Sequence, residues 1–134
     1  MPRQPLTNSD IAELLAVEAQ SAKMPTQKAL RRASRRAFLW PEEAAGLLQQ
    51  GRSLTELSGV GPYIEKLLTR WIDKPPAIPE RPEIRRQFFT FTEAQKILAK
   101  KPVWLGLVKG DLQMHTTWSD GEGSIAEMAD AAIT

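Results

Sequence analysis

The sequence predicts a mainly α-helical protein that ends in one β-strand and one further helix. Three observations predict this fold class. Apolar residues recur at helical spacing through residues 8–72, helix-capping residues stand before most of these stretches, and four prolines within residues 73–82 then interrupt the pattern. We therefore expect a helical domain over residues 1–73, a Pro-rich extended connector over 74–91, a linking helix and the start of a strand over 92–109, and a separate segment over 110–134.

The helical domain is expected to begin with three helices. Asn8 or Ser9 can cap the first helix, because the side chains of both residues accept hydrogen bonds from free amides. The second helix is expected over residues 26–38, with its apolar residues facing inward. Pro41 suits the first turn of the third helix, and Gly51 is expected to end it.

Two further helices are expected to form a hairpin at the end of this domain. Ser53 and Glu56 have the spacing of a capping box for a short fourth helix. This helix breaks at Gly59-Val60-Gly61, and a fifth helix follows from Pro62 to about Ile72. Apolar residues on both sides of the glycines are expected to clamp the two helices together, namely Leu54, Leu57, Val60, Ile64, Leu67 and Leu68.

After the connector, one helix and one strand are expected. Thr92 and Gln95 again have capping-box spacing, and they would open a helix to about Lys100 that Pro102 ends. Residues 105–115 are then expected to form a strand. Since this strand has no neighbouring strand in the chain, we expect it to be poorly packed or paired with a second copy of the protein.

The last residues are expected to form an apolar helix. Ser124 and Glu127 make a third capping box, and the helix should cover residues 125–133. No C-cap residue follows before Thr134, so we expect the sequence to continue in a longer protein.

Composition and charge limit the classes of function. The chain has no Cys, which excludes disulfides and thiolate metal sites, and neither a membrane span nor a signal peptide is recognisable, so a cytoplasmic location is expected. All 18 basic residues and 11 of the 16 acidic residues precede residue 111, whereas 5 acidic residues follow it. The first part suits a polyanion and the second suits cations. A merely solvated basic surface is the alternative.

A basic stripe on the second helix is the first candidate binding site. Its members are Lys28, Arg31, Arg32, Arg35 and Arg36, and no acidic residue stands between Lys23 and Trp40. Arginine can bind phosphate oxygens bidentately, so the stripe favours a phosphate-rich ligand over a solvated charged face. Trp40 and Trp71 are expected in the core.

The Gly59-Val60-Gly61 turn is the second candidate site. Glycines allow close approach of a ligand to the backbone, and the start of the next helix offers free amides and a positive dipole end to phosphate. Tyr63 is the expected side-chain contact with nucleic acid. An ordinary turn between two helices, whose glycines serve only the turn, is the alternative.

This segment resembles the helix-hairpin-helix motif, and residues 8–72 resemble the N-terminal domain of X-family DNA polymerases of the polymerase β type. The resemblance implies binding to DNA backbone without sequence specificity, with Gly59, Val60, Gly61 and Lys66 among the contacts. Some members of that family use a Lys for lyase chemistry six residues after the second glycine. That position is Leu67 here, so we predict no lyase activity and no catalytic residue.

The sequence Gly110-Asp-Leu-Gln-Met-His-Thr-Thr-Trp-Ser-Asp-Gly121 resembles the first motif of PHP (polymerase and histidinol phosphatase) domains. The resemblance implies the first strand and helix of a barrel whose metal ions are zinc or manganese. His115 matches one histidine of the motif, whereas Gln113 replaces the other, so the expected metal site is incomplete and this chain is expected to bind no metal. Asp120 is expected to shape the turn.

Three functions are therefore open. The first is a DNA-binding module that brings a PHP phosphoesterase related to polymerase X to DNA, in a role such as DNA repair. The second is an enzyme, in which the parent protein hydrolyses a phosphomonoester or a nucleic-acid end. The third is a helical module that docks a protein partner through apolar surface.

Overall fold

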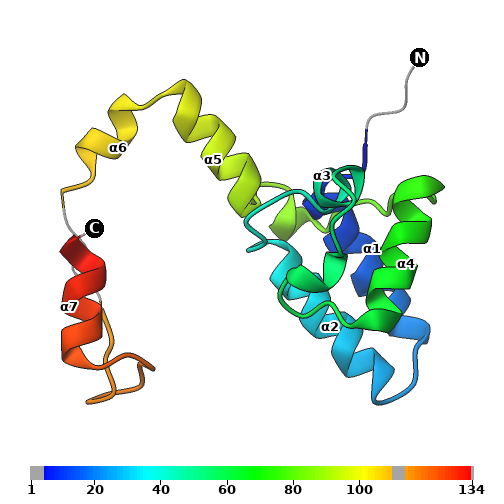
Figure 1. The fold of residues 1–134 in the computed structure, drawn as a ribbon, viewed down its shortest axis with the longest axis horizontal. Helices are drawn as coiled ribbons and strands as arrows, with labels where there is room; N and C mark the ends of the chain where they lie inside the picture. Colours follow the sequence, from blue (N-terminus) through cyan, green and yellow to red (C-terminus); the bar gives the residue numbers. More distant parts are fainter. Residues whose placement is uncertain (1–4, 110–113, 134) are drawn as a thin grey trace. The chain divides into compact units, whose positions relative to one another are not determined.

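The computed structural model describes residues 5–109 and 114–133, and these residues are mainly helical, as the sequence predicts. The chain divides into two compact units, Met1–Ala99 and Lys100–Thr134. The α-helices, labelled in Figure 1, are α1 (Asn8–Ser21), α2 (Thr26–Ala37), α3 (Ala44–Gln49), α4 (Pro62–Asp73), α5 (Phe91–Lys100), α6 (Val103–Leu107) and α7 (Ile125–Ile133). Two short 3-10 helices, η1 (Leu54–Glu56) and η2 (Glu83–Arg85), lie between them.

Thr7, not Asn8 or Ser9, caps the first helix. The Thr7 hydroxyl accepts a hydrogen bond from the amide of Asp10 at 3.2 Å, and the Asp10 carboxylate accepts one from the amide of Thr7 at 3.0 Å. Together these two bonds make a capping box. Asn8 and Ser9 lie inside the helix, where both are buried.

Asn8 caps α3 instead. Its side-chain oxygen accepts from the amide of Ala44 at 2.9 Å, and its side-chain nitrogen donates to the carbonyl of Glu42 at 2.8 Å. Its own amide donates to the carboxylate of Glu43 at 2.7 Å. Because a buried polar group must find partners within the protein, this amide fixes the start of α3 against the start of α1.

Glycine ends α3, as predicted. Gly51 has a φ of +71°, the left-handed conformation, and the amide of Arg52 donates to the carbonyl of Leu47 at 3.1 Å. This geometry is a Schellman motif. The predicted first turn at Pro41 is wrong, because α3 begins only at Ala44, after a non-helical stretch that carries its caps.

The two glycines of this region should respond oppositely to alanine. Gly51→Ala forces a Cβ into the left-handed region and should destabilise the protein by about 1–2 kcal/mol. Gly46 lies inside α3, and its added Cβ would meet nothing closer than Glu43 at 4.0 Å. Gly46→Ala should therefore stabilise by about 0.5–1 kcal/mol. Urea unfolding of the two variants measures both values, and a loss in both would contradict this account of α3.

One hydrophobic core holds the first unit together. Ser34 on α2 donates to the carbonyl of Ala12 on α1 at 2.8 Å, and Gln27 donates to the carbonyl of Ala19 near the end of α1 at 3.0 Å. Trp71 is 7% exposed and packs in this core, as predicted. Its largest fully buried apolar side chains are Ile11, Leu15, Leu30, Trp40, Leu47, Leu54 and Leu68.

The residues after α4 pack onto this core. Arg85 of η2 forms two hydrogen bonds with the carboxylate of Glu13 on α1, at 2.8 and 2.7 Å, and the Glu13 side chain is only 4% exposed. The hydrogen bonds to Glu13 raise the pKa of Arg85. A second pair joins Arg81 to Asp10 at 3.6 Å. The first unit consequently extends beyond α4 to Ala99.

The capping box of α5 lies two residues before the predicted one. Thr90 and Glu93 form it, with bonds of 2.7 and 3.2 Å between each side chain and the other's amide. Thr92 is buried and donates a short hydrogen bond to Glu43. Because Thr92 bonds to α3, the predicted pairing of Thr92 with Gln95 is wrong.

The predicted C-terminal strand is wrong. Within the described residues there is no strand, and Val103–Leu107 form α6 instead. Pro102 stands at the N-cap of α6, where its fixed φ and missing amide are tolerated. A strand needs a neighbour for its backbone groups, and the described chain offers none. The predicted barrel fragment and the predicted strand pairing between two copies therefore have no support; residues 110–113 lie outside the described residues.

The second unit is built around a tight loop. Its predicted capping box is confirmed, since Ser124 and Glu127 exchange bonds of 2.7 and 3.2 Å before α7. Gly121 lies against the backbone of His115 and Thr116, where an added Cβ would come within 2.4 Å of the His115 carbonyl. No residue of α6 or α7 is buried.

Candidate nucleic-acid interface

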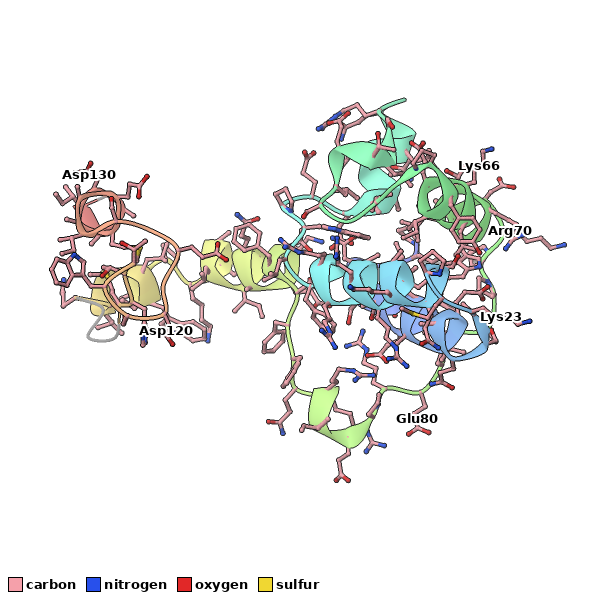
Figure 2. The ribbon with its side chains drawn as sticks, turned by 90° about the horizontal axis from the view of Figure 1, so that it is seen from below. Lys23, Lys66, Arg70, Glu80, Asp120 and Asp130 are labelled. Carbon is pink, nitrogen blue, oxygen red and sulfur yellow. The ribbon has the colours of Figure 1, made fainter. Side chains whose placement is uncertain are left out.

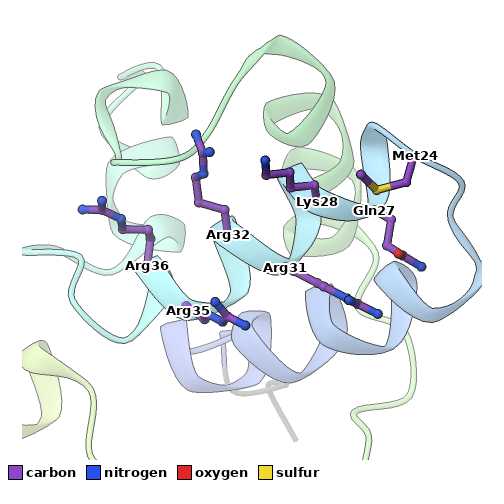
Figure 3. Close-up of a pocket in the computed structure, with 7 residues that line it drawn as sticks. All are labelled: Met24, Gln27, Lys28, Arg31, Arg32, Arg35 and Arg36. Atoms are coloured by element: carbon purple, nitrogen blue, oxygen red, sulfur yellow. The ribbon is translucent and has the colours of Figure 1, made fainter.

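The five basic residues of α2 are all exposed and line one surface groove. Leu30, Ala33 and Ala37 face the core, which leaves the rest of the helix surface to the cations. Figure 3 shows Lys28 and Arg32 on one side of α2 and Arg31 and Arg35 on the other, with Arg36 beyond. With Met24 and Gln27 these residues line a groove of about 530 Å³, namely Lys28, Arg31, Arg32, Arg35 and Arg36.

This cationic groove carries charge without counter-charge. Within the described residues none of its five cations forms an ion pair with a carboxylate. Clustered like charges repel one another, and no nearby acid on α2 offsets that repulsion. Such a surface lowers its energy by binding a polyanion, and it releases that anion as salt rises.

The glycine turn lies directly against α2. Gly59 has a φ of +84°, and a Cβ built there would lie 3.4 Å from the Cγ of Arg36 and 3.6 Å from the Cα of Ala33. The turn and the cationic groove are therefore neighbours. Gly61 is different, because no atom lies within 4 Å of the position of its missing side chain.

Val60 does not face solvent. Its side chain is 7% exposed and belongs to the core, and its amide donates to the carbonyl of Leu57 at 3.1 Å. Neither group of Val60 is available to a ligand, so the predicted contact at this residue would have to come from its flanking glycines.

The start of α4 is open. Gly61 is its N-cap and supplies no side-chain hydrogen bond, and the first helical bond runs from the amide of Glu65 to the carbonyl of Gly61 at 2.9 Å. Within the described chain the amides of Tyr63 and Ile64 meet no acceptor. Tyr63 is 55% exposed, and the glycine turn with Pro25, Thr26 and Ala29 of the α2 end encloses a groove of about 290 Å³.

A carboxylate that the sequence patterns do not indicate fixes this turn. Glu65 of α4 accepts hydrogen bonds from the hydroxyl of Ser53 at 2.6 Å and from the amide of Leu54 at 2.8 Å. The predicted capping box of Ser53 with Glu56 is wrong, because Glu56 pairs with Arg52 at 2.5 Å. Glu65 stands 12 residues from Ser53, beyond the reach of any local motif.

Acid should loosen this clamp. The hydrogen bond from Ser53 lowers the pKa of Glu65 below its ordinary value of 4.5. A lowered pKa stabilises the fold above the ordinary value, and that contribution is lost as the pH falls through the folded-state pKa. We expect Glu65→Gln to flatten the fall of melting temperature below pH 4.5 without changing its slope near pH 7. An unchanged acid limb, recorded by circular dichroism, would refute this role.

Lys66 is exposed on α4 and projects into solvent together with Arg70, four residues later on the same helix (Figure 2). Leu67, by contrast, is 4% exposed and packs in the core. The residue at the lyase position of the resemblance is therefore buried and apolar.

The residues predicted to hold a metal do not form a metal site. The Nδ1 atom of His115 contacts a carboxylate oxygen of Asp120 at 2.6 Å, so Asp120 pairs with the imidazole across the loop. Gln113 lies outside the described residues. No three His, Asp or Glu side chains of the described residues are grouped closely enough to hold an ion. His115 and Asp120 alone do not fit the three-ligand requirement of a hydrolytic metal centre.

None of the helices in the described part of the chain has the length and apolarity that a membrane span requires.

Comparison with known proteins finds similarity over part of the chain. No protein-family model matches, and neither does any solved structure. Part of the chain is similar to a protein of the polymerase X type. That relative is the DNA polymerase/3'-5' exonuclease PolX of Bacillus subtilis (strain 168), with 46% identity over 61 residues. The match covers 43% of this chain and 10% of the relative, so the chain spans about a tenth of the relative's length. The polymerase X part of the resemblance is thereby supported.

Proposed function

We propose that the first unit is a DNA-binding module that grips the sugar-phosphate backbone without reading sequence. The observation that carries the proposal is the contact between α2 and the glycine turn, which places the unpaired cations beside the open start of α4. Basic side chains and free helix amides both bind phosphate, and neither distinguishes one base from another. Similarity to a relative named as a DNA polymerase supports DNA as the polyanion.

The two halves of this surface have separate roles in the proposal. The cations of α2 attract the strand over several ångströms, since their field is screened only beyond about 10 Å at 0.1 M salt. The amides of Tyr63 and Ile64 then bond to individual phosphate oxygens at contact distance. Gly61 leaves room for that contact, because any side chain there would stand between backbone and ligand.

Titration of the whole chain with a labelled DNA duplex at several salt concentrations tests the proposal. Five phosphate contacts would give a slope of about −4.5 in a plot of log affinity against log salt. Two duplexes of unrelated sequence should bind alike. Affinity that is independent of salt, or no binding tighter than about 10⁻⁴ M at low salt, would contradict the proposal. Charge reversal on α2 that left DNA binding unchanged would instead favour a module that docks a protein partner.

A second candidate function, hydrolysis of a phosphoester, belongs in the proposal only for a protein that contains more than these residues. It is favoured by the paired His115 and Asp120 within the motif of residues 110–121, and by the exonuclease named in the relative. The present chain is expected to release no phosphate from a phosphomonoester with Zn²⁺ or Mn²⁺ added. Activity in this chain that His115→Ala removes would show that two side chains suffice.

A further inference from the structure

An apolar groove lies beside the cationic groove and is not explained by backbone binding. It forms between the end of α2 and the residues that follow η2, and its volume is about 530 Å³. Leu39 is 68% exposed, Phe88 51% and Phe89 63%. Exposed apolar groups that gather in one groove typically mark an interaction site.

The rings of this groove are held in position. Phe88 meets Phe38 edge to face, with ring centroids 6.4 Å apart and planes at 80°. The amide of Phe88 donates to the carbonyl of Arg85 at 3.1 Å, and Arg85 is anchored by its pair with Glu13. The amide of Phe91 donates to the carbonyl of Phe38 at 2.7 Å. An ordered aromatic surface costs little entropy when a flat ligand covers it.

Arg35 connects this groove to the cationic groove, because its side chain lines both. Arg35 forms no ion pair within the described residues, and its charge favours an anionic occupant over an uncharged apolar peptide. A ligand that lays its phosphates along α2 would therefore carry its next chemical groups into the aromatic groove.

We infer that this groove binds unpaired bases of single-stranded DNA, with Phe89 as the stacking surface. The inference rests on the proposed function and adds its substrate class. Every base has an aromatic face, so stacking on Phe89 tolerates any sequence, as backbone binding does. A duplex keeps its bases paired and stacked and offers the groove only its phosphates. The protein consequently prefers a single strand to a duplex of equal length.

The test compares a 12-nucleotide single strand, a duplex of the same length and an abasic single strand, each titrated with the whole chain. Phe89→Ala should weaken single-strand binding about 10-fold or more and leave the duplex and abasic strands unchanged. Phe89→Trp should restore stacking, whereas Phe89→Leu, which is apolar but not aromatic, should not. A 2-aminopurine base in the strand should lose fluorescence on binding the wild-type chain and keep more of it with Phe89→Ala.

Ile84→Ala is the matched control, since Ile84 is 77% exposed and lies outside the groove. If the chain binds all three DNAs alike and Phe89→Ala changes none of them, the stacking groove is overturned while the proposed function stands. If Phe89→Leu binds as the wild type does, the groove holds an apolar group other than a base, which also overturns the inference. If the chain binds no DNA, the proposed function itself fails.

Discussion

Reversing two charges on α2, Lys28→Glu with Arg32→Glu, should weaken DNA binding by roughly 60-fold or more at 0.1 M salt. Each phosphate contact contributes about 0.9 to the slope of log affinity against log salt, so the loss of two contacts lowers affinity by nearly two orders of magnitude at that salt. The slope itself should fall by about 1.8. Fluorescence anisotropy with a labelled duplex at four salt concentrations measures both quantities.

The control reverses an equal number of charges elsewhere in the same unit. Lys74 and Lys96 are both exposed and lie outside the cationic groove. Lys74 follows the last residue of α4, at the end opposite the glycine turn. Lys74→Glu with Lys96→Glu should change affinity only slightly, through the net charge. Equal losses in the two double variants would mean that net charge alone, not the arrangement on α2, holds the DNA.

Replacement of Trp40 by alanine should destabilise the protein by about 3–5 kcal/mol, the largest effect of any single substitution we expect. Trp40 is 1% exposed, and its indole N–H donates to the carbonyl of Ser58 at 2.9 Å. The substitution leaves a cavity and a carbonyl without its partner. Since domains are stable by only about 5–15 kcal/mol, a large share of the molecules could unfold at 37 °C. Urea unfolding followed by far-ultraviolet circular dichroism gives the loss.

Two further tryptophan variants separate packing from hydrogen bonding. Trp40→Phe keeps most of the buried ring and loses only the bond to Ser58, so its cost should be about 1–3 kcal/mol. Trp118 is 86% exposed in the second unit, and Trp118→Ala should stay within about 0.5 kcal/mol of the wild type. A loss below 1 kcal/mol for Trp40→Ala would mean that Trp40 is not the anchor between α2 and the glycine turn.

The positions of α2 and α4 could be predicted from the sequence because each carries a clear apolar stripe and a local start. Their caps are less predictable, since a capping residue is chosen by its tertiary surroundings. Asn8 and Thr92 both have good capping chemistry, yet both bond to Glu43 or its neighbours, and Thr7 and Thr90 cap the helices. Local spacing cannot indicate which of two nearby polar residues becomes buried.

The strand failed for a related reason. The pattern of residues 105–115 matched the motif of a family whose strand sits in a sheet, and a strand is stable only with its neighbours. Helix geometry satisfies backbone groups locally, so Val103–Leu107 form α6 where no sheet is present. Sequence similarity identified the motif, but not the environment that the strand would need.

The chemistry of the candidate site was more predictable than its assembly. Helical spacing alone groups the cations of α2, and glycine alone indicates an open turn. Neither indicates that Gly59 packs against Arg36, or that Glu65 bonds to Ser53 across the turn. These contacts join residues 12 or more positions apart, and packing of the core around Leu54 and Leu68 brings them together.

The most direct test is an NMR titration of the ¹⁵N-labelled chain with a short DNA duplex. If cations and free amides form one binding surface, the amides of Gly59, Gly61, Tyr63 and Ile64 should shift together with those of Lys28–Arg36. All should then fit one dissociation constant. Shifts on α2 that leave Gly61, Tyr63 and Ile64 unmoved at saturation would contradict the account, because the glycine turn would then take no part in holding the phosphates.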